Sequence, residues 1–152
     1  MNDLLLENID KLIEYGQGEV NISEDDKIEN LEYLLISIYK QILELPKRFD
    51  DTNKECPKID YEVIKKQVEK NFSNFGYYNT VFNGIENFDN PETVVGDSID
   101  DLADIIKDLI EAKWYFENSS PDDAIWQIKF DFESHFRYHI LGLLKYLHDI
   151  KK

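Results

Sequence analysis

Apolar residues recur every three or four positions in about five stretches of this chain, a spacing typical of amphipathic helices. In the clearest of them, which Pro46 ends, they fall within an arc of roughly 120° on a helical wheel. No segment alternates polar and apolar residues over a useful length. The sequence therefore predicts an all-α fold.

Capping residues indicate where the helices begin. Such signals occur at Ser23, Asp60, Ser98 (with Asp101) and Ser120 (followed by Pro121). We expect a first helix that Gly16 and Gly18 end, then helices over about 24–45, 61–72, 98–116 and 121–147. The 152 residues and 18.0 kDa suit one domain over 1–152, a bundle of about five helices.

Residues 73–96 do not fit this pattern. Their Asn and Gly content and Pro91 argue against a long helix, and their aromatic residues argue against disorder. We expect a long aromatic-rich loop before the fourth helix. Its aromatic residues either hold the loop over an open end of the bundle or form a recognition surface that includes Tyr77 and Tyr78.

Charge limits the classes of partner. The chain has 17 basic and 32 acidic residues and a formal net charge of −15, so we expect neither nucleic-acid nor membrane binding. A single cysteine, Cys56, excludes an intramolecular disulfide. With no apolar run of membrane-spanning length and no basic leader, we expect a cytoplasmic protein. We expect no cofactor.

An acidic row marks the predicted fourth helix. Its carboxylates are spaced by four, three, four and three residues, at Asp97, Asp101, Asp104, Asp108 and Glu111. D-x-x-D spacing can collect Mg²⁺ or Mn²⁺, but such ligands must point inward between helices. On the wheel the row lies opposite the apolar face. We therefore expect it to face solvent or a partner.

The last predicted helix carries Asp131, His135 and His139 at spacings of four, with Arg137 and His148 nearby. These three residues could together bind a transition-metal ion. The alternative, which we favour, is a partly buried imidazole bonded to a neighbouring carboxylate or carbonyl, with His135 and Asp131 paired along the helix.

Three segments together resemble a bacterial family known as domain of unknown function 5063. They are Phe75-Gly76-Tyr77-Tyr78, the run from Gly96 to Ile105 (GDSIDDLADI), and the run from Trp126 to His135 (WQIKFDFESH). The resemblance extends from about Tyr33 to the C-terminus, with Phe136 where the family leads us to expect tryptophan. It implies a small helical cytoplasmic protein without an established activity, and it draws attention to Asp97, Asp100, Asp101, Asp104, His135 and His139.

No nucleophile elbow, phosphate-binding glycine loop or dinucleotide fingerprint is present in the sequence. We therefore expect a non-enzymatic acidic module that binds a basic protein, for example an immunity protein or antitoxin. Its candidate binding residues are Asp97, Asp100, Asp101, Asp104, Asp108, Glu111, Tyr77 and Tyr78.

Two alternatives remain open. One is a divalent-metal phosphohydrolase with ligands among Asp97, Asp101, Asp104, Asp108, His135 and His139. The other is a structural subunit of a homo-oligomer, with an apolar patch around Trp114 and Trp126. The oligomeric state is left undetermined by the sequence.

Overall fold

A computed structural model describes residues 1–49 and 53–151. The elements are α1 (Asp3–Gln17), α2 (Glu24–Glu44), α3 (Tyr61–Asn71), β1 (Tyr77–Phe82), β2 (Glu92–Asp97), α4 (Ser98–Asn118), α5 (Pro121–Asp131), η1 (Phe132–Phe136) and α6 (Arg137–Ile150). The prediction of a mostly helical single domain is confirmed. Among the described helices, none is long and apolar enough to cross a membrane.

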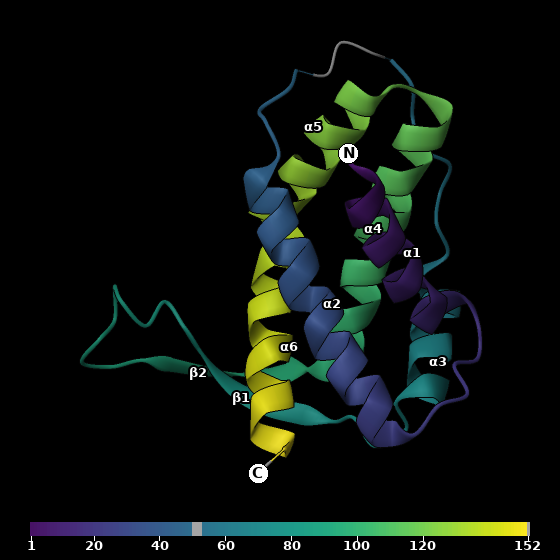
Figure 1. The fold of residues 1–152 in the computed structure, drawn as a ribbon. Helices are drawn as coiled ribbons and strands as arrows, with labels where there is room; N and C mark the ends of the chain where they lie inside the picture. The colour runs from purple at the N-terminus through teal and green to yellow at the C-terminus, as the bar shows by residue number, and fades with distance from the viewer. Residues whose placement is uncertain (50–52, 152) are drawn as a thin grey trace.

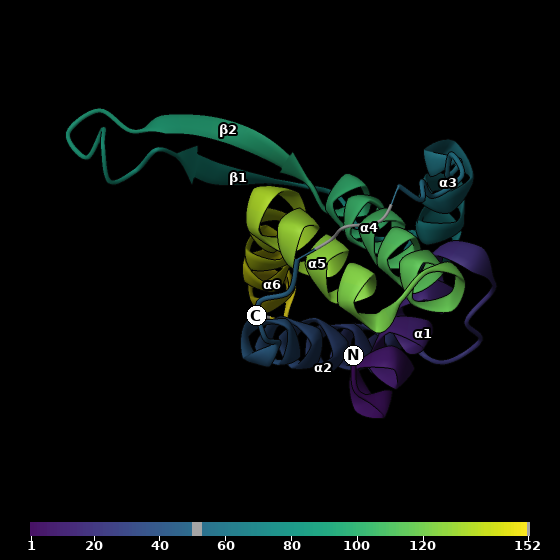
Figure 2. The same ribbon diagram turned by 90° about the horizontal axis from the view of Figure 1, so that it is seen from above.

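Helix α4 occupies the centre of the bundle, with α1, α3, α5 and α6 packed around it (Figures 1 and 2). Most of its apolar residues are almost completely removed from solvent, and these join one core cluster with α1, α2, α3 and α6. They include Leu102, Ala103, Ile105, Ile106, Leu109 and Ala112. A helix surrounded in this way presents its polar face to protein as well as to water.

Three predicted caps are confirmed. Ser23, Asp60 and Ser120 accept backbone N–H groups at the starts of α2, α3 and α5. The cap predicted at Ser98 is wrong, because Asp97 caps α4 by accepting from the backbone nitrogens of Ile99 and Asp100. The Ser98 hydroxyl instead donates to the carbonyl of Gly76 at 2.6 Å and ties the β-hairpin to the helix.

The last predicted helix is continuous through α5, η1 and α6, but η1 is a π-helical turn. Phe132 and Phe136 in this turn are buried in the core. A π turn inserts an extra residue into the helix and often occurs at functional sites. One of the candidate histidines, His135, is part of this turn.

The prediction of a loop over 73–96 is wrong. Strands β1 and β2 pair antiparallel, with Tyr77 opposite Asp97 and Phe82 opposite Glu92, and the hairpin projects from the bundle (Figures 1 and 2). Only the base of the segment is pinned, since Phe75 and Tyr78 pack against the core. The aromatic and β-branched residues of β1 are good strand formers, and this signal outweighs the nearby Asn and Gly.

Candidate functional site

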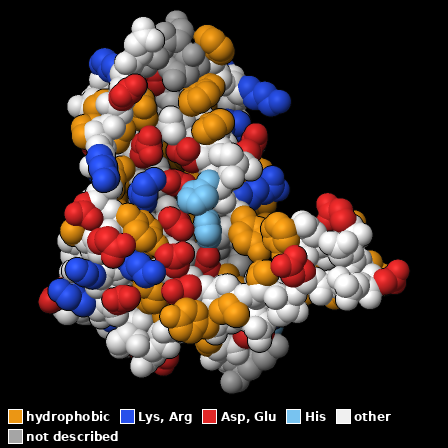
Figure 3. Space-filling model, turned by 180° about the vertical axis from the view of Figure 1, so that it is seen from behind, with side chains coloured by type: hydrophobic (Ala, Val, Ile, Leu, Met, Phe, Trp, Pro, Cys, Tyr) orange, Lys and Arg blue, Asp and Glu red, His pale blue; other side chains and the backbone are white. Residues whose placement is uncertain are grey.

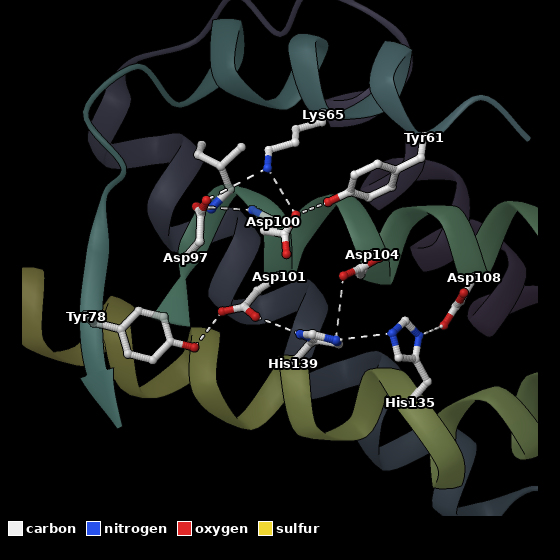
Figure 4. A network of polar contacts seen from close by, with 11 residues as sticks. Tyr61, Lys65, Tyr78, Asp97, Asp100, Asp101, Asp104, Asp108, His135 and His139 are labelled. Carbon is white, nitrogen blue, oxygen red and sulfur yellow. Dashed lines mark hydrogen bonds and ion pairs between the residues drawn. The ribbon is translucent and has the colours of Figure 1, made fainter. Parts of the chain in front are cut away.

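The acidic row of α4 does not point into bulk water. Asp101 and Asp108 are only 6% and 4% exposed, so the prediction of a solvent-facing row is wrong for these two residues. The polar face of α4 meets α6 and η1, and His135 of η1 and His139 of α6 lie against it (Figure 4). Burying a carboxylate is costly unless it is paired, and both are paired with histidine.

Each buried carboxylate holds one imidazole. The Nδ1 atom of His135 lies 2.6 Å from Asp108, and the Nδ1 atom of His139 lies 2.7 Å from Asp101. The expected partly buried imidazole, bonded to a neighbouring carboxylate or carbonyl, is therefore confirmed for His139, and its partner is a carboxylate of α4. Its side chain is 18% exposed, whereas that of His135 is 45% exposed.

The other ring nitrogens converge. The Nε2 atoms of His135 and His139 are 3.3 Å apart, and Asp104 places a carboxylate oxygen 3.7 Å from the Nε2 atom of His139. Ligand atoms of these three residues all lie within 4.8 Å of one another. We call Asp104, His135 and His139 the His–Asp cluster. In the view from behind, the histidines lie at the surface among acidic side chains (Figure 3).

The arrangement brings three acceptors together. An ionised carboxylate can only accept hydrogen bonds, so Nδ1 of each imidazole carries the proton that is donated to Asp101 or Asp108. The Nε2 atom of a neutral histidine is then a bare acceptor. Two such atoms and the Asp104 carboxylate repel one another unless a cation, either a proton or a metal ion, lies between them.

Asp104 differs from its neighbours in the row. It accepts no hydrogen bond from any other residue in the described part of the chain, and its side chain is 20% exposed. Burial raises the pKa of Asp104, and the nearby imidazole of His139 only partly offsets this effect. This carboxylate is therefore available for a ligand that the cluster admits.

The pKa of His139 reflects two opposing effects. Burial acts to lower it, but the hydrogen bond to Asp101 and the charges of Asp101, Asp104 and Asp100 outweigh burial and raise the pKa. The site therefore favours positive charge at this imidazole.

A second layer of tyrosine and lysine surrounds the cluster. The Tyr78 hydroxyl donates to Asp101 at 2.5 Å, and the Tyr61 hydroxyl donates to Asp100. Burial, followed by these hydrogen bonds, raises the pKa of both tyrosines, so each keeps its proton and acts as a donor. Lys65 lies 3.1 Å from Asp100 and 3.9 Å from Asp97.

The remaining candidates lie outside the cluster. The side-chain amide of Gln127 donates a hydrogen bond to Asp131 at 2.8 Å. The predicted pairing of Asp131 with His135, and its place among the possible metal ligands, are therefore wrong. Arg137 donates to the Tyr39 hydroxyl, and His148 is exposed on α6. Tyr77 is 76% exposed on the hairpin, whereas its neighbour Tyr78 points inward.

Three residues near the cluster were not predicted as site residues from the sequence: Tyr61, Lys65 and Lys107. Tyr61 and Lys65 are four residues apart on α3, and Lys107 lies 3.4 Å from Asp108. The spacing of Tyr61 and Lys65 places both on one face of α3, but only the packing of α3 against α4 shows what that face meets.

Fold and site together define a small helical protein with a half-buried His–Asp cluster beside a projecting hairpin. The chain matches the family described as domain of unknown function (DUF5063) over residues 36–152, and it belongs to that family. The family suggested by the sequence is thus confirmed.

A solved structure, protein BF1032 from Bacteroides fragilis, has the same fold. The two superpose with a TM-score of 0.75 at 15% sequence identity, over 97% of this chain and 90% of the other. At this identity the likeness concerns the fold alone. No curated protein matches the chain.

Proposed function

We propose that this protein binds one divalent transition-metal ion through Asp104, His135 and His139, and uses it for hydrolytic chemistry. The observation that carries this proposal is the 3.3 Å separation of two Nε2 atoms whose Nδ1 atoms are both held by buried carboxylates. This proposal replaces the expectation that the protein has no cofactor.

The separation of the two Nε2 atoms suits a tetrahedral ion. Two ligand atoms at about 2.05 Å from a tetrahedral zinc ion are separated by about 3.3 Å. Buried carboxylates on the far nitrogens fix the tautomer and orientation of metal-binding histidines in many metal sites. Asp101 and Asp108 have this relation to His139 and His135.

The donor set favours zinc or a neighbouring transition metal over magnesium. Imidazole nitrogen suits Zn²⁺, Co²⁺, Ni²⁺ and Fe²⁺, whereas Mg²⁺ prefers six oxygen ligands. The sequence-based metal alternative relied on the Asp row. In this proposal Asp101 and Asp108 orient the imidazoles, and Asp97 caps α4.

Three protein ligands leave a coordination position open, as in catalytic rather than structural zinc sites. His135 is 45% exposed, so a water molecule and a small substrate can reach that position. A metal ion held by Asp104, His135 and His139 would supply Lewis-acid chemistry, which includes lowering the pKa of a bound water toward neutrality. The chemistry that this supports is hydrolysis of a polarised carbonyl or phosphoryl bond.

The binding-module hypothesis stays a prediction with less support. It needs the carboxylates of α4 at an accessible surface, and Asp101 and Asp108 are buried against histidines. A cytoplasmic location remains our expectation.

The test is metal binding by the intact chain after treatment with a chelator. We expect Zn²⁺ or Co²⁺ at about a hundred times its Kd to raise Tm by about 5–10 °C. We expect Co²⁺ to give the visible absorption of a tetrahedral complex, and millimolar Mg²⁺ to leave Tm unchanged.

Two substitutions locate the ion. His139→Gln and Asp104→Asn should weaken Co²⁺ binding at least tenfold, whereas His148→Gln, on the same helix but exposed, should not. Absence of binding by all of Zn²⁺, Co²⁺, Ni²⁺ and Mn²⁺ would overturn the proposal. So would an equal loss of binding in the His148→Gln control.

A further inference from the structure

The β-hairpin is an arm that its own chain leaves largely uncovered. It stands away from the bundle in both ribbon views (Figures 1 and 2) and is attached at its base, where Ser98 and Tyr78 bond to neighbouring elements. A two-stranded hairpin is marginally stable at best by itself in water. The arm of residues 77–97 therefore needs another surface to cover it.

One face and the tip of the arm are apolar and exposed. Register and the two-residue period of a strand place Tyr77, Val81 and Val95 on the same face, where they are 76%, 49% and 69% exposed. At the tip, Ile85 and Phe88 are 93% and 81% exposed. Contiguous exposed apolar residues of this kind mark an interaction site.

The same chain carries an unfilled apolar groove between α2 and α6. The groove has a volume of about 320 Å³, and it is lined by Ile36, Tyr39, Lys40, Leu43, Leu141 and Leu144. Three of its side chains, Ile36, Leu43 and Leu141, are 53%, 54% and 51% exposed. This surface is distinct from the region of Trp126, where Lys47, Arg48 and Lys129 surround the indole ring.

Groove and arm adjoin. Gly142, next to Leu141 of the groove, lies so close to Tyr78 that an added Cβ would fall 2.3 Å from the tyrosine hydroxyl. The arm thus leaves the bundle across α6 at the edge of the groove.

Charge and length also match. The arm contains Glu86, Asp89 and Glu92 but no lysine or arginine. The groove is bordered by Lys40 and by Arg137, whose guanidinium lies 5.4 Å from the Tyr39 ring centre. The groove spans Ile36 to Leu43, about 10 Å of helix, and the distal half of a six-residue strand covers a similar length.

We propose that the arm docks in the α2–α6 groove of a second copy, and that the two copies exchange arms in a closed symmetric dimer. A second copy fits better than an unrelated partner because both halves of the contact are on one chain. Two-fold exchange then buries both arms and both grooves at once. Acidic arms against cation-bordered grooves also reduce the repulsion between two chains of charge −15.

Sedimentation velocity on the intact chain tests this proposal. We expect a species of twice 18.0 kDa at micromolar concentration. Ile85→Asp in the arm and Leu141→Asp in the groove should each raise the dimer dissociation constant at least tenfold. Val63→Asp, at a 62% exposed site on α3, serves as a matched control and should leave it unchanged. All three substituted side chains lie on the surface, so circular dichroism should report unaltered folding.

Mixing the two variants gives the sharpest result. Each variant alone lacks both arm–groove contacts, but a heterodimer regains one, between the intact arm of Leu141→Asp and the intact groove of Ile85→Asp. We expect dimer to reappear in the mixture. A monomeric wild type at 100 µM, an open polymer, a dimer that survives both substitutions, or two monomeric variants that stay monomeric when mixed would each overturn the proposal.

Discussion

At the scale of single residues, carboxylates on neighbouring helices have very different environments. Asp108 is buried against His135, whereas Asp131 has the amide of Gln127 as its hydrogen-bond donor. Burial raises the pKa of Asp131 to about 7, and the charges of Asp108 and Glu111 add to the increase. Ionisation of Asp131 therefore lowers the stability of the native state.

Asp131→Asn should stabilise the protein at pH 8 more than at pH 5. The native carboxyl keeps its proton up to about pH 7, whereas the unfolded one loses it near 3.8. Stability is therefore lost as the pH rises from about 4 through 7, because the unfolded chain then binds fewer protons. Asparagine retains an acceptor for Gln127 and removes this loss.

Urea unfolding at pH 5 and pH 8 measures the difference. Glu133→Gln, an exposed acid two residues further along, controls for the removal of one negative charge from the chain. If Asp131→Asn has the same effect at both pH values, or matches Glu133→Gln throughout, the burial of this carboxyl has no influence on stability.

At the scale of elements, the joint between α6 and the hairpin depends on two glycines. Added Cβ atoms at Gly96 and Gly142 would fall within 2.3 Å of Tyr78 atoms, so the ring occupies the space that these residues leave. Gly142 lies inside α6, where alanine would otherwise favour the helix by about 1 kcal/mol. The Tyr78 ring therefore disfavours alanine at position 142, although alanine is usually preferred to glycine inside a helix.

Gly142→Ala should destabilise the wild-type protein by about 1 kcal/mol or more, because overpacking of this kind costs roughly 1–3 kcal/mol. In a Tyr78→Phe background the same substitution should be neutral or stabilising, since the hydroxyl that it meets is gone. A double-mutant cycle by urea unfolding gives the coupling. Equal effects in both backgrounds would contradict the prediction; Gly76→Ala, with open space around it, is the control.

Helix periodicity and caps were readable from the sequence, but neighbours of a helix were not. Ser23, Asp60 and Ser120 cap as predicted because a cap depends on three or four adjacent residues. The wheel placed the acids of α4 opposite its apolar face correctly. It contained no information on α6 and η1, which cover that polar face and bury Asp101 and Asp108.

The hairpin was not predicted, and the residues of the cluster appeared only within the larger ligand set of the metal alternative. Strand β1 is only six residues long and is flanked by loop-forming residues, so local propensity gave a mixed signal. Asp131 has the same spacing to His135 as His139 has, but the π turn at 132–136 lies between them. The residue that completes the cluster, Asp104, comes from a different helix, α4.

At the scale of the whole molecule, the charge of −15 opposes compaction. Basic residues offset it locally, as where Lys113 lies 2.5 Å from Asp10 and 3.7 Å from Glu117. Much of the repulsion is between exposed carboxylates, and ordinary salt screens it over a Debye length of about 10 Å at 0.1 M.

Stability should therefore rise with sodium chloride. Between about 20 and 300 mM we expect the free energy of unfolding to increase by roughly 1 kcal/mol. Urea titrations in chloride, which avoid the general stabilisation caused by sulfate, measure the change. A constant or falling stability over this range would mean that the local ion pairs outweigh the net repulsion.

The Tyr78 hydroxyl joins the arm to the imidazole that it indirectly positions, since Asp101 accepts from Tyr78 with one oxygen and from His139 with the other. A tilt of the hairpin that lengthens the hydrogen bond between Tyr78 and Asp101 also leaves the Asp101 carboxylate, and the imidazole bonded to it, free to rotate. By thermodynamic reciprocity, a contact that holds the arm in place would strengthen the binding of the proposed metal ion at His139, and that ion would strengthen the contact by the same free energy.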